Sequence, residues 1–522
     1  MRISKLLTLI LALLMVLSAF AGCGEGAPNE SDSQNGSDTG SSSSNESETE
    51  TSKYDDILVG VSFPGVVLKV LVGDDCEVSE YVETLEEKSD VLDQATFNRC
   101  DFAENRLQIR TKWSSAGSVG ESGEGIIETA ERENSNGGTY DIIASKSSWS
   151  APMMTHGVFS NLLKYPHFDF EEDGWAKTLI EDVSVGNKLY VATGDISVNL
   201  LFMTSVVFFN KGLVEDLNIN TKIQSHADWE ASNLYELVEK GKWTLDKLIT
   251  LSENVYKDGG ISGKDNGKKD SGDRFGFNTY KQLLENFYYG GGYTTIVAEG
   301  DSFGISESYL SSDLMGDLLS QVNNFLHETK DGIIEEGSKP YDPTRLNFAA
   351  GNILFCMAPA SHAYNTHSKA AELNYSVLPV PKHSESQESY ACTQSFPYML
   401  YSIASHAHNP VPASAFMQAL AIESYTTTRP TILDTMMKGR YAEDPKDAKM
   451  WEYAIDANTF DVGRIFQDLF KEESTGKIMT VDLIRDRILE DKDSWTHIMD
   501  TYSEPLVYAT VDLATKITKL PD

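Results

Sequence analysis

Short β-branched runs alternate with longer segments of helical spacing along most of the chain. The pattern predicts strands at 56–63, 106–113 and 141–144, with helices between them at 90–100 and 126–134. Strands that alternate with helices of this length are typical of βαβ units. We therefore predict an α/β architecture.

A polar run directly follows the predicted strand at 141–144. Ser145, Lys146, Ser147 and Ser148 come first, and Trp149 closes the run. In open α/β sheets, ligands bind beyond the carboxyl ends of the strands. This strand end is therefore a candidate edge of a binding site.

The middle of the chain carries a long amphipathic pattern at 233–258. We predict a helix there, with Thr244 as a cap and Trp243 as a core residue just before the cap. Further strands are predicted at 200–210 and within 346–364.

The first residues have the pattern of a secretory signal peptide. Arg2 and Lys5 supply positive charge, and the apolar run from Leu6 to Phe20 is short for a membrane-spanning helix, which needs about 20 residues. Small residues precede Cys23, which resembles a lipobox. We expect 1–22 to be a lipoprotein signal peptide and Cys23 to be the lipidation site.

Segment 23–53 is rich in Ser, Asn, Gly and Glu and nearly lacks apolar residues, which predicts a disordered tether. The remaining chain is too long for one ordinary domain, and 40% of all residues are hydrophobic, which indicates two lobes. No second apolar run is long enough to span a membrane. The net charge of −36 argues against nucleic acid or anionic lipid as a partner, since both need clustered cations.

The four remaining cysteines do not have a zinc-binding spacing, and the ten histidines are scattered. Two disulfides and buried free thiols are both compatible with Cys76, Cys100, Cys356 and Cys392. We expect no cofactor.

Several segments, in this order, resemble the extracellular solute-binding proteins of ABC importers, in particular the sugar-type family that includes maltose-binding protein. They read YDIIAS, GNKLYVATGD, VVFFNKGLVEDLNI, GKWTLDKL, DRFGF, FAAGNILFCMAP, YSVLPVPK and SIASHAHNP. The resemblance implies a two-lobed type II clamp with three hinge crossings, near 195–205, 353–357 and 402–408. Lobe one would comprise 54–200 plus 357–402, and lobe two 205–353 plus 408–522.

The same resemblance implies a set of ligand contacts. They belong to the strand-end loop, the first crossing, the region after the FGF turn, and the segment that replaces the family's Gly-Pro-Trp. The candidates are Ser147, Ser148, Trp149, Asp195, Tyr280 with its rivals Tyr288 and Tyr289, and Ser361, His362 and Tyr364. Such residues suit a sugar, because aromatic rings pack on its C–H faces while polar groups bind its hydroxyls.

The loop DNGKKDSGDRFGF resembles calcium-type loops of some related binding proteins. Asp265, Asp270 and Asp273 are its weak calcium candidates, but their spacing does not match an EF-hand loop. A solvated turn is the simpler interpretation.

The resemblance implies a monomeric lipoprotein that is anchored on the outer face of the cell membrane, captures a carbohydrate of oligosaccharide size, and delivers it to an ABC permease. A sugar sensor that partners a signalling receptor is one alternative. A surface glycan-degrading enzyme is another, and it would need two opposed carboxylates. The chain carries no HExxH or P-loop motif, so we do not predict an enzyme.

Overall fold

The computed structural model describes residues 57–73, 76–86, 89–116, 124–259, 266–270, 272–490 and 492–521. These residues belong to one compact unit, Ser52–Asp522. The predicted signal peptide, Cys23 and the tether lie outside the described residues. No helix within the described ranges is both long and apolar enough to cross a membrane.

The first of two main sheets has the order β12-β3-β1-β2. β1 runs parallel to both β2 and β3, and β12 runs antiparallel to β3. Its strands are β1 (Val67–Val72), β2 (Arg110–Ser115), β3 (Ile142–Lys146) and β12 (Met399–Ile403). We call this sheet and the helices packed on it the first lobe.

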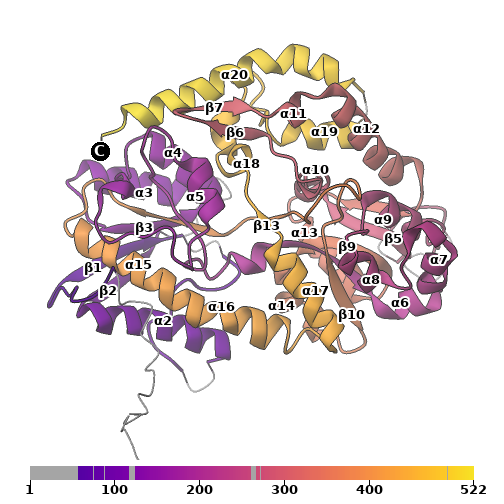
Figure 1. The fold of residues 1–522 in the computed structure, drawn as a ribbon, viewed down its shortest axis with the longest axis horizontal. Helices are drawn as coiled ribbons and strands as arrows, with labels where there is room; N and C mark the ends of the chain where they lie inside the picture. Colours follow the sequence, from indigo (N-terminus) through magenta and orange to yellow (C-terminus); the bar gives the residue numbers. More distant parts are fainter. Residues whose placement is uncertain are drawn as a thin grey trace, which may run out of the picture. The chain divides into compact units, whose positions relative to one another are not determined.

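Helices of the first lobe come from distant parts of the chain. Asp90 begins the first of them with a capping box, because its carboxylate accepts from two backbone N–H groups while Asp93 accepts from the Asp90 N–H. α15 packs against α2 (Figure 1). These helices are α2 (Val91–Leu107), α3 (Glu124–Ser135), α4 (Ser147–Thr155), α5 (Lys177–Val183), α15 (Pro410–Thr426) and α16 (Thr428–Pro430).

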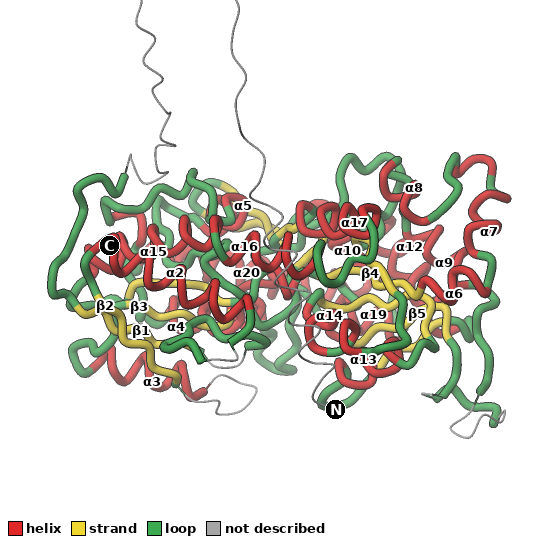
Figure 2. The backbone as a smooth tube through the Cα atoms, turned by 90° about the horizontal axis from the view of Figure 1, so that it is seen from below, coloured by secondary structure: helices red, strands yellow, loops and turns green. Residues whose placement is uncertain are grey.

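The second sheet has the order β10-β4-β9-β5-β8 and lies apart from the first (Figure 2). β5 runs parallel to β8 and β9, whereas β4 runs antiparallel to β9 and β10. Its strands are β4 (Ser205–Asn210), β5 (Phe275–Tyr280), β8 (Gly332–Glu335), β9 (Ile353–Pro359) and β10 (Tyr375–Pro379). This sheet and its helices form the second lobe.

The hairpin of β6 (Ile296–Glu299) and β7 (Ser302–Ile305) lies outside the main sheet of the second lobe. The helices of this lobe are α6 (Lys211–Asp216), α7 (Ile219–Ser225), α8 (Leu234–Glu239), α9 (Leu245–Ser252), α10 (Asn286–Gly290), α11 (Glu307–Leu310), α12 (Ser312–Asn323), α13 (Tyr341–Ala349), α14 (Ser361–Asn365), α17 (Pro445–Asp456) and α19 (Asp482–Glu490). The last helix, α20 (Trp495–Lys519), packs against both β7 and α4 (Figure 1).

Three segments of the chain lie side by side between the two sheets. β11 (Cys392–Thr393) pairs with β13 (Asn458–Thr459), and Gln394 forms a β-bridge with Thr204. The Thr204 hydroxyl also donates to the Asn458 side-chain oxygen over 2.9 Å. We call this set of paired segments the hinge seam.

The predicted strand at 56–63 is wrong, because the first strand is β1, which begins at Val67. The predicted helix at 233–258 is divided into α8 and α9. Gly241 ends α8 in the left-handed region with a φ of +65°, which disfavours a continuous helix. Trp243 lies between them as a core residue, as predicted, and its indole N–H donates to the Pro379 carbonyl over 2.9 Å.

The predicted lobe boundaries need correction. The resemblance implied a return to the first lobe over 357–402, yet β10 pairs with β4 and therefore extends the second lobe. It also placed 408–522 in the second lobe, whereas α15 packs on α2 of the first. Both errors concern pairings between segments far apart in sequence, which local patterns do not encode.

None of the four cysteines in the described part of the chain forms a disulfide. Cys100, Cys356 and Cys392 are buried, and burial raises the pKa of each thiol above its ordinary value. Of the two possibilities left open by the sequence, the structure has free thiols at these three buried positions.

A buried acid in α15 gives a pH-dependent prediction. Burial raises the pKa of Glu423 to about 7, so the folded chain keeps this carboxyl protonated at pH values where the unfolded chain ionises it. Its contribution to stability is therefore complete below pH 4.5 and declines as the pH rises toward 7. Glu423→Gln should be more stable than the parent at pH 8 by roughly 1–3 kcal/mol. Urea unfolding at pH 5 and pH 8 measures this, and an equal difference at both pH values would contradict it.

Candidate ligand-binding site

A cavity of about 530 Å³ lies where side chains of both lobes meet. Lys146 ends β3, while Tyr280 and Pro359 end β5 and β9. Cys76 and Glu77 follow β1. The cavity thus lies beyond the carboxyl ends of parallel strands in both sheets, where α/β proteins bind ligands.

Aromatic rings supply part of the cavity wall. Tyr280, Tyr341 and Phe396 line it from three different segments. Tyr280 is 5% exposed, and burial raises the pKa of its hydroxyl above the ordinary value, so the group stays protonated and can donate. Rings of this kind offer flat apolar surfaces beside polar groups.

Two arginines, Arg464 and Arg485, share one buried carboxylate at the cavity. Glu285 accepts from Arg485 over 2.5 and 2.7 Å and from the Arg464 Nε over 3.3 Å. Although burial opposes its charge, Arg485 has a raised pKa because of Glu285. Arg464 also donates to the Gln394 carbonyl of the hinge seam and lies 4.7 Å from the Phe396 ring centroid. Both guanidinium groups line the cavity, whereas Glu285 is behind them.

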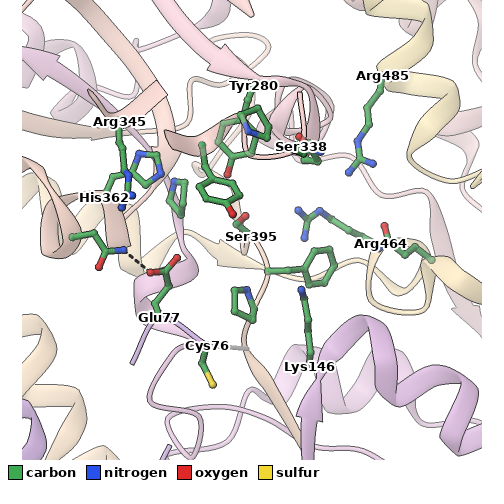
Figure 3. A pocket seen from close by; sticks show the side chains of 18 of the residues that line it. Cys76, Glu77, Lys146, Tyr280, Ser338, Arg345, His362, Ser395, Arg464 and Arg485 are labelled. Carbon is green, nitrogen blue, oxygen red and sulfur yellow. Dashed lines mark hydrogen bonds between the residues drawn. The ribbon is translucent and has the colours of Figure 1, made fainter. Parts of the chain in front are cut away.

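Arg345 and His362 form a second group of nitrogen-bearing side chains on the wall. Figure 3 shows them together on one side of the cavity, with Arg464 and Arg485 on the other. Burial, with a contribution from the positive charge of Arg345, lowers the pKa of His362 to about 3. The imidazole is therefore neutral at physiological pH and can both donate and accept.

The first lobe contributes Lys146 and Glu77. The Lys146 ammonium lies 4.9 Å from the centroid of the Trp149 ring, which holds it by a cation–π contact. Asn365 of α14 donates to the Glu77 carboxylate, which connects the two lobes at the edge of the cavity.

The structure places only two of the predicted contacts, Tyr280 and His362, on the cavity wall. Ser147, Ser148 and Trp149 begin α4 and are buried. Trp149 instead supports Lys146, its neighbour toward β3. The cavity therefore lies at the strand edge that the sequence indicated, but Lys146, the residue just before Ser147, provides the lining side chain.

The remaining predicted contacts interact with other residues of the protein and do not line the cavity. Asp195 forms an ion pair with Arg429 at 3.1 Å and does not line the cavity. Tyr289 donates to Asp461, and Tyr288 donates to the Thr294 carbonyl. Ser361 is buried in α14, and the Tyr364 ring packs at 5.4 Å from that of Phe202.

Two calcium candidates accept hydrogen bonds from the loop or from the segment that precedes it. Asp270 accepts from the Asn266 amide over 2.6 Å, and Asp273 accepts from the Tyr256 hydroxyl and the Gly259 N–H. Asp265 lies outside the described residues. Within the described ranges, no group of His, Cys, Asp or Glu side chains has the arrangement of a metal site.

Sequence reasoning missed the basic residues of the cavity. Arg345, Arg464 and Arg485 come from α13, α18 (Val462–Ile465) and α19, which are far apart in the sequence. None of them has a local motif. Lys146 alone carried a signal, because it follows a predicted strand.

No protein-family model and no curated protein matches the sequence. Solved structures match at 11–14% identity. One is the maltose-binding periplasmic protein MalE of Listeria monocytogenes in complex with maltose, at 11% identity, a TM-score of 0.51, and coverage of 87% of this chain and 99% of that one. A second is the galacto-N-biose-/lacto-N-biose I-binding protein of the ABC transporter from Bifidobacterium longum, at 12% identity and a TM-score of 0.51. That match covers 87% of this chain and 99% of that one. A third is the cyclic α-maltosyl-1,6-maltose binding protein of Arthrobacter globiformis, at 11% identity and a TM-score of 0.52. That match covers 86% of this chain and 100% of that one.

The chain has the fold of these sugar-binding proteins. The predicted α/β clamp of maltose-binding type is thereby confirmed as a fold. All three neighbours are named as binding proteins. At such low sequence identity the likeness shows the fold alone. The chemistry of the solute therefore follows from the side chains that line the cavity of this chain.

Proposed function

We propose that this chain is the substrate-binding lipoprotein of an ABC transporter and that it captures a carbohydrate between its lobes for delivery to a permease. The observation that carries the proposal is the 530 Å³ cavity, which side chains of both lobes line at the carboxyl ends of their strands. A volume of this size is in the range of small-molecule sites.

The composition of the wall supports a sugar. Tyr280, Tyr341 and Phe396 can pack on the C–H faces of pyranose rings. Gln282, Ser338, Asn365, Ser395 and Gln467 add hydrogen-bonding groups for hydroxyls. The three structural neighbours are named for sugars that they bind, which favours the same class here.

The proposed mechanism is capture without chemistry. A solute that contacts both lobes favours the closed arrangement by the difference between its affinities for the closed and the open forms. The hinge seam would act as the axis of that movement. An acylated Cys23 would keep the protein at the outer membrane face, beside the permease that receives the solute.

A thermal-shift screen of the full chain against a glycan panel tests the proposal. A carbohydrate present at about 100 times its Kd should stabilise the folded state by roughly 2.7 kcal/mol and raise the melting temperature. Chromatography should recover the same carbohydrate intact after prolonged incubation. Silence across all sugars, together with a shift for peptides or polyamines, would exclude the carbohydrate assignment. Hydrolysis of the bound glycan would exclude the assignment as a binding protein.

A further inference from the structure

The charge of the cavity wall is opposite to that of the chain. The sequence has 79 acidic and 43 basic residues. Among the described residues that line the cavity, however, four are basic and one is a carboxylate. They are Lys146, Arg345, Arg464 and Arg485, with Glu77. A protein that is acidic overall thus presents cations where its solute would bind.

The carboxylates that neutralise these arginines do not line the cavity. Glu285 is completely buried and lies between Arg464 and Arg485. Asp342 and Asp482, which pair with Arg345 and Arg485, are partly exposed elsewhere. A solute in the cavity therefore meets the guanidinium groups directly, while the neutralising carboxylates lie beyond them.

The charged side chains of the wall also carry more hydrogen-bond donors than acceptors. A guanidinium group has five N–H donors and no acceptor. Two donors of Arg464 are used in the contacts to Glu285 and Gln394, and one donor of Arg345 is used in the contact to Asp342, so each guanidinium group keeps further N–H donors. Glu77, the lining carboxylate, already accepts from Asn365. The wall offers more donors than acceptors, which fits a solute rich in acceptors.

The cations are also divided between the lobes. Lys146 belongs to the first lobe, and Arg345 and Arg485 belong to the second. Arg464 comes from α18, which contacts α4 and α5 of the first lobe as well as β6. Figure 3 shows the Lys146 side chain pointing from below toward the side of the cavity where Arg464 lies. Like charges on facing lobes oppose their approach, whereas an anion between them is attracted by both.

We propose that the captured carbohydrate is acidic, bearing a carboxylate, phosphate or sulfate group that Lys146 and the arginines bind together. The inference rests on the proposed function and specifies its substrate class. The anionic group is an acceptor without donors, which matches the wall, and guanidinium groups bind such oxyanions in a bidentate manner. The aromatic side chains pack on the sugar rings that carry it.

Calorimetric titration of the full chain tests the inference with matched probes. Trigalacturonate carries carboxylates, glucose 6-phosphate a phosphate, and a sulfated chondroitin disaccharide both a sulfate and a carboxylate. Maltotriose is the neutral control, and acetate, phosphate and sulfate alone are the controls for simple anion binding. We expect at least one acidic sugar to bind at least 10-fold more tightly than maltotriose. That affinity should fall as the ionic strength rises.

Substitutions connect the affinity with the cavity. Lys146→Met and Arg345→Gln should each weaken the binding of the acidic sugar by about 10- to 100-fold, because a hydrogen bond to a charged group is lost. Lys112→Met removes a solvent-exposed lysine of β2 in the same sheet and should leave the affinity unchanged. Melting temperatures of the three variants show that each is folded.

The outcomes separate this inference from the proposed function. Binding of maltotriose or other neutral glycans in preference to the acidic probes would overturn the inference and leave the carbohydrate function intact. Binding of no carbohydrate at all would overturn both. Binding of acidic sugars that Lys146→Met and Arg345→Gln do not weaken would also overturn the inference, because the cations of this cavity would then not be responsible.

Discussion

Replacing Glu80 by alanine is expected to lower the free energy of unfolding by roughly 3–5 kcal/mol, the range for breaking a buried ion pair. Glu80 is 2% exposed and faces the fully buried Arg99 at 3.4 Å. Its carboxylate also accepts from the backbone N–H of Val198 and Asn199 and from the Tyr401 hydroxyl. Alanine would leave Arg99 as an uncompensated buried charge and would free the segment that leads to the second lobe.

Equilibrium unfolding in urea measures this loss. Glu80→Gln keeps the shape and part of the hydrogen bonding but removes the charge, so its loss should be smaller than that of Glu80→Ala. Glu83→Ala, three residues away at an exposed position, should change stability by less than about 0.5 kcal/mol. Equal stability of the Glu80 and Glu83 variants would refute the structural role of Glu80.

A loss of similar size is expected for Glu285→Ala, again roughly 3–5 kcal/mol. This carboxylate is completely buried and is shared by Arg464 and Arg485, whose side chains are 5% and 9% exposed. Without it, two guanidinium groups would repel each other, and Arg485 would keep the partly exposed Asp482 as a carboxylate partner. The same change should loosen both arginines at the cavity and weaken solute binding as well.

An exposed ion pair of α19 provides the control for this variant. Glu490 and Lys492 lie 2.8 Å apart, with side chains 58% and 70% exposed. Glu490→Ala should therefore cost less than about 1 kcal/mol and leave binding unaffected. If Glu285→Ala were no more destabilising than Glu490→Ala, the shared carboxylate would not hold the arginines as described.

Local patterns predicted much of the fold. Apolar periodicity located the helix that begins at Val91 and the strands around Ile142 and Ser205, and the aromatic Trp243 was assigned correctly to the core. These features depend on neighbours within about ten residues, which a sequence pattern records. The lobe boundaries depended on β10 pairing with β4, which joins residues more than 150 positions apart.

The cavity was harder to predict for the same reason. Arg345, Arg464 and Arg485 have no spacing that relates them, and their common location results from the packing of three separate helices around one carboxylate. Asp195 shows the converse case, a residue that was predicted as a ligand contact but does not line the cavity. Its carboxylate accepts a hydrogen bond from Arg429. Long-range charge pairing is therefore decisive for this site, and it is visible only in three dimensions.

The hinge seam has a consequence for how movement of the lobes can be observed. Adjacent segments are joined edge to edge, with the Ser395 N–H donating to the Met203 carbonyl over 2.6 Å and the Cys392 N–H to the Ala457 carbonyl over 2.7 Å. Sliding or twisting of one lobe past the other would break these bonds, whereas a rotation about the seam preserves them. The opening proposed for the clamp would therefore be a rotation about the seam. One pair of fluorescent labels, placed on opposite lobes far from the seam, would report that rotation.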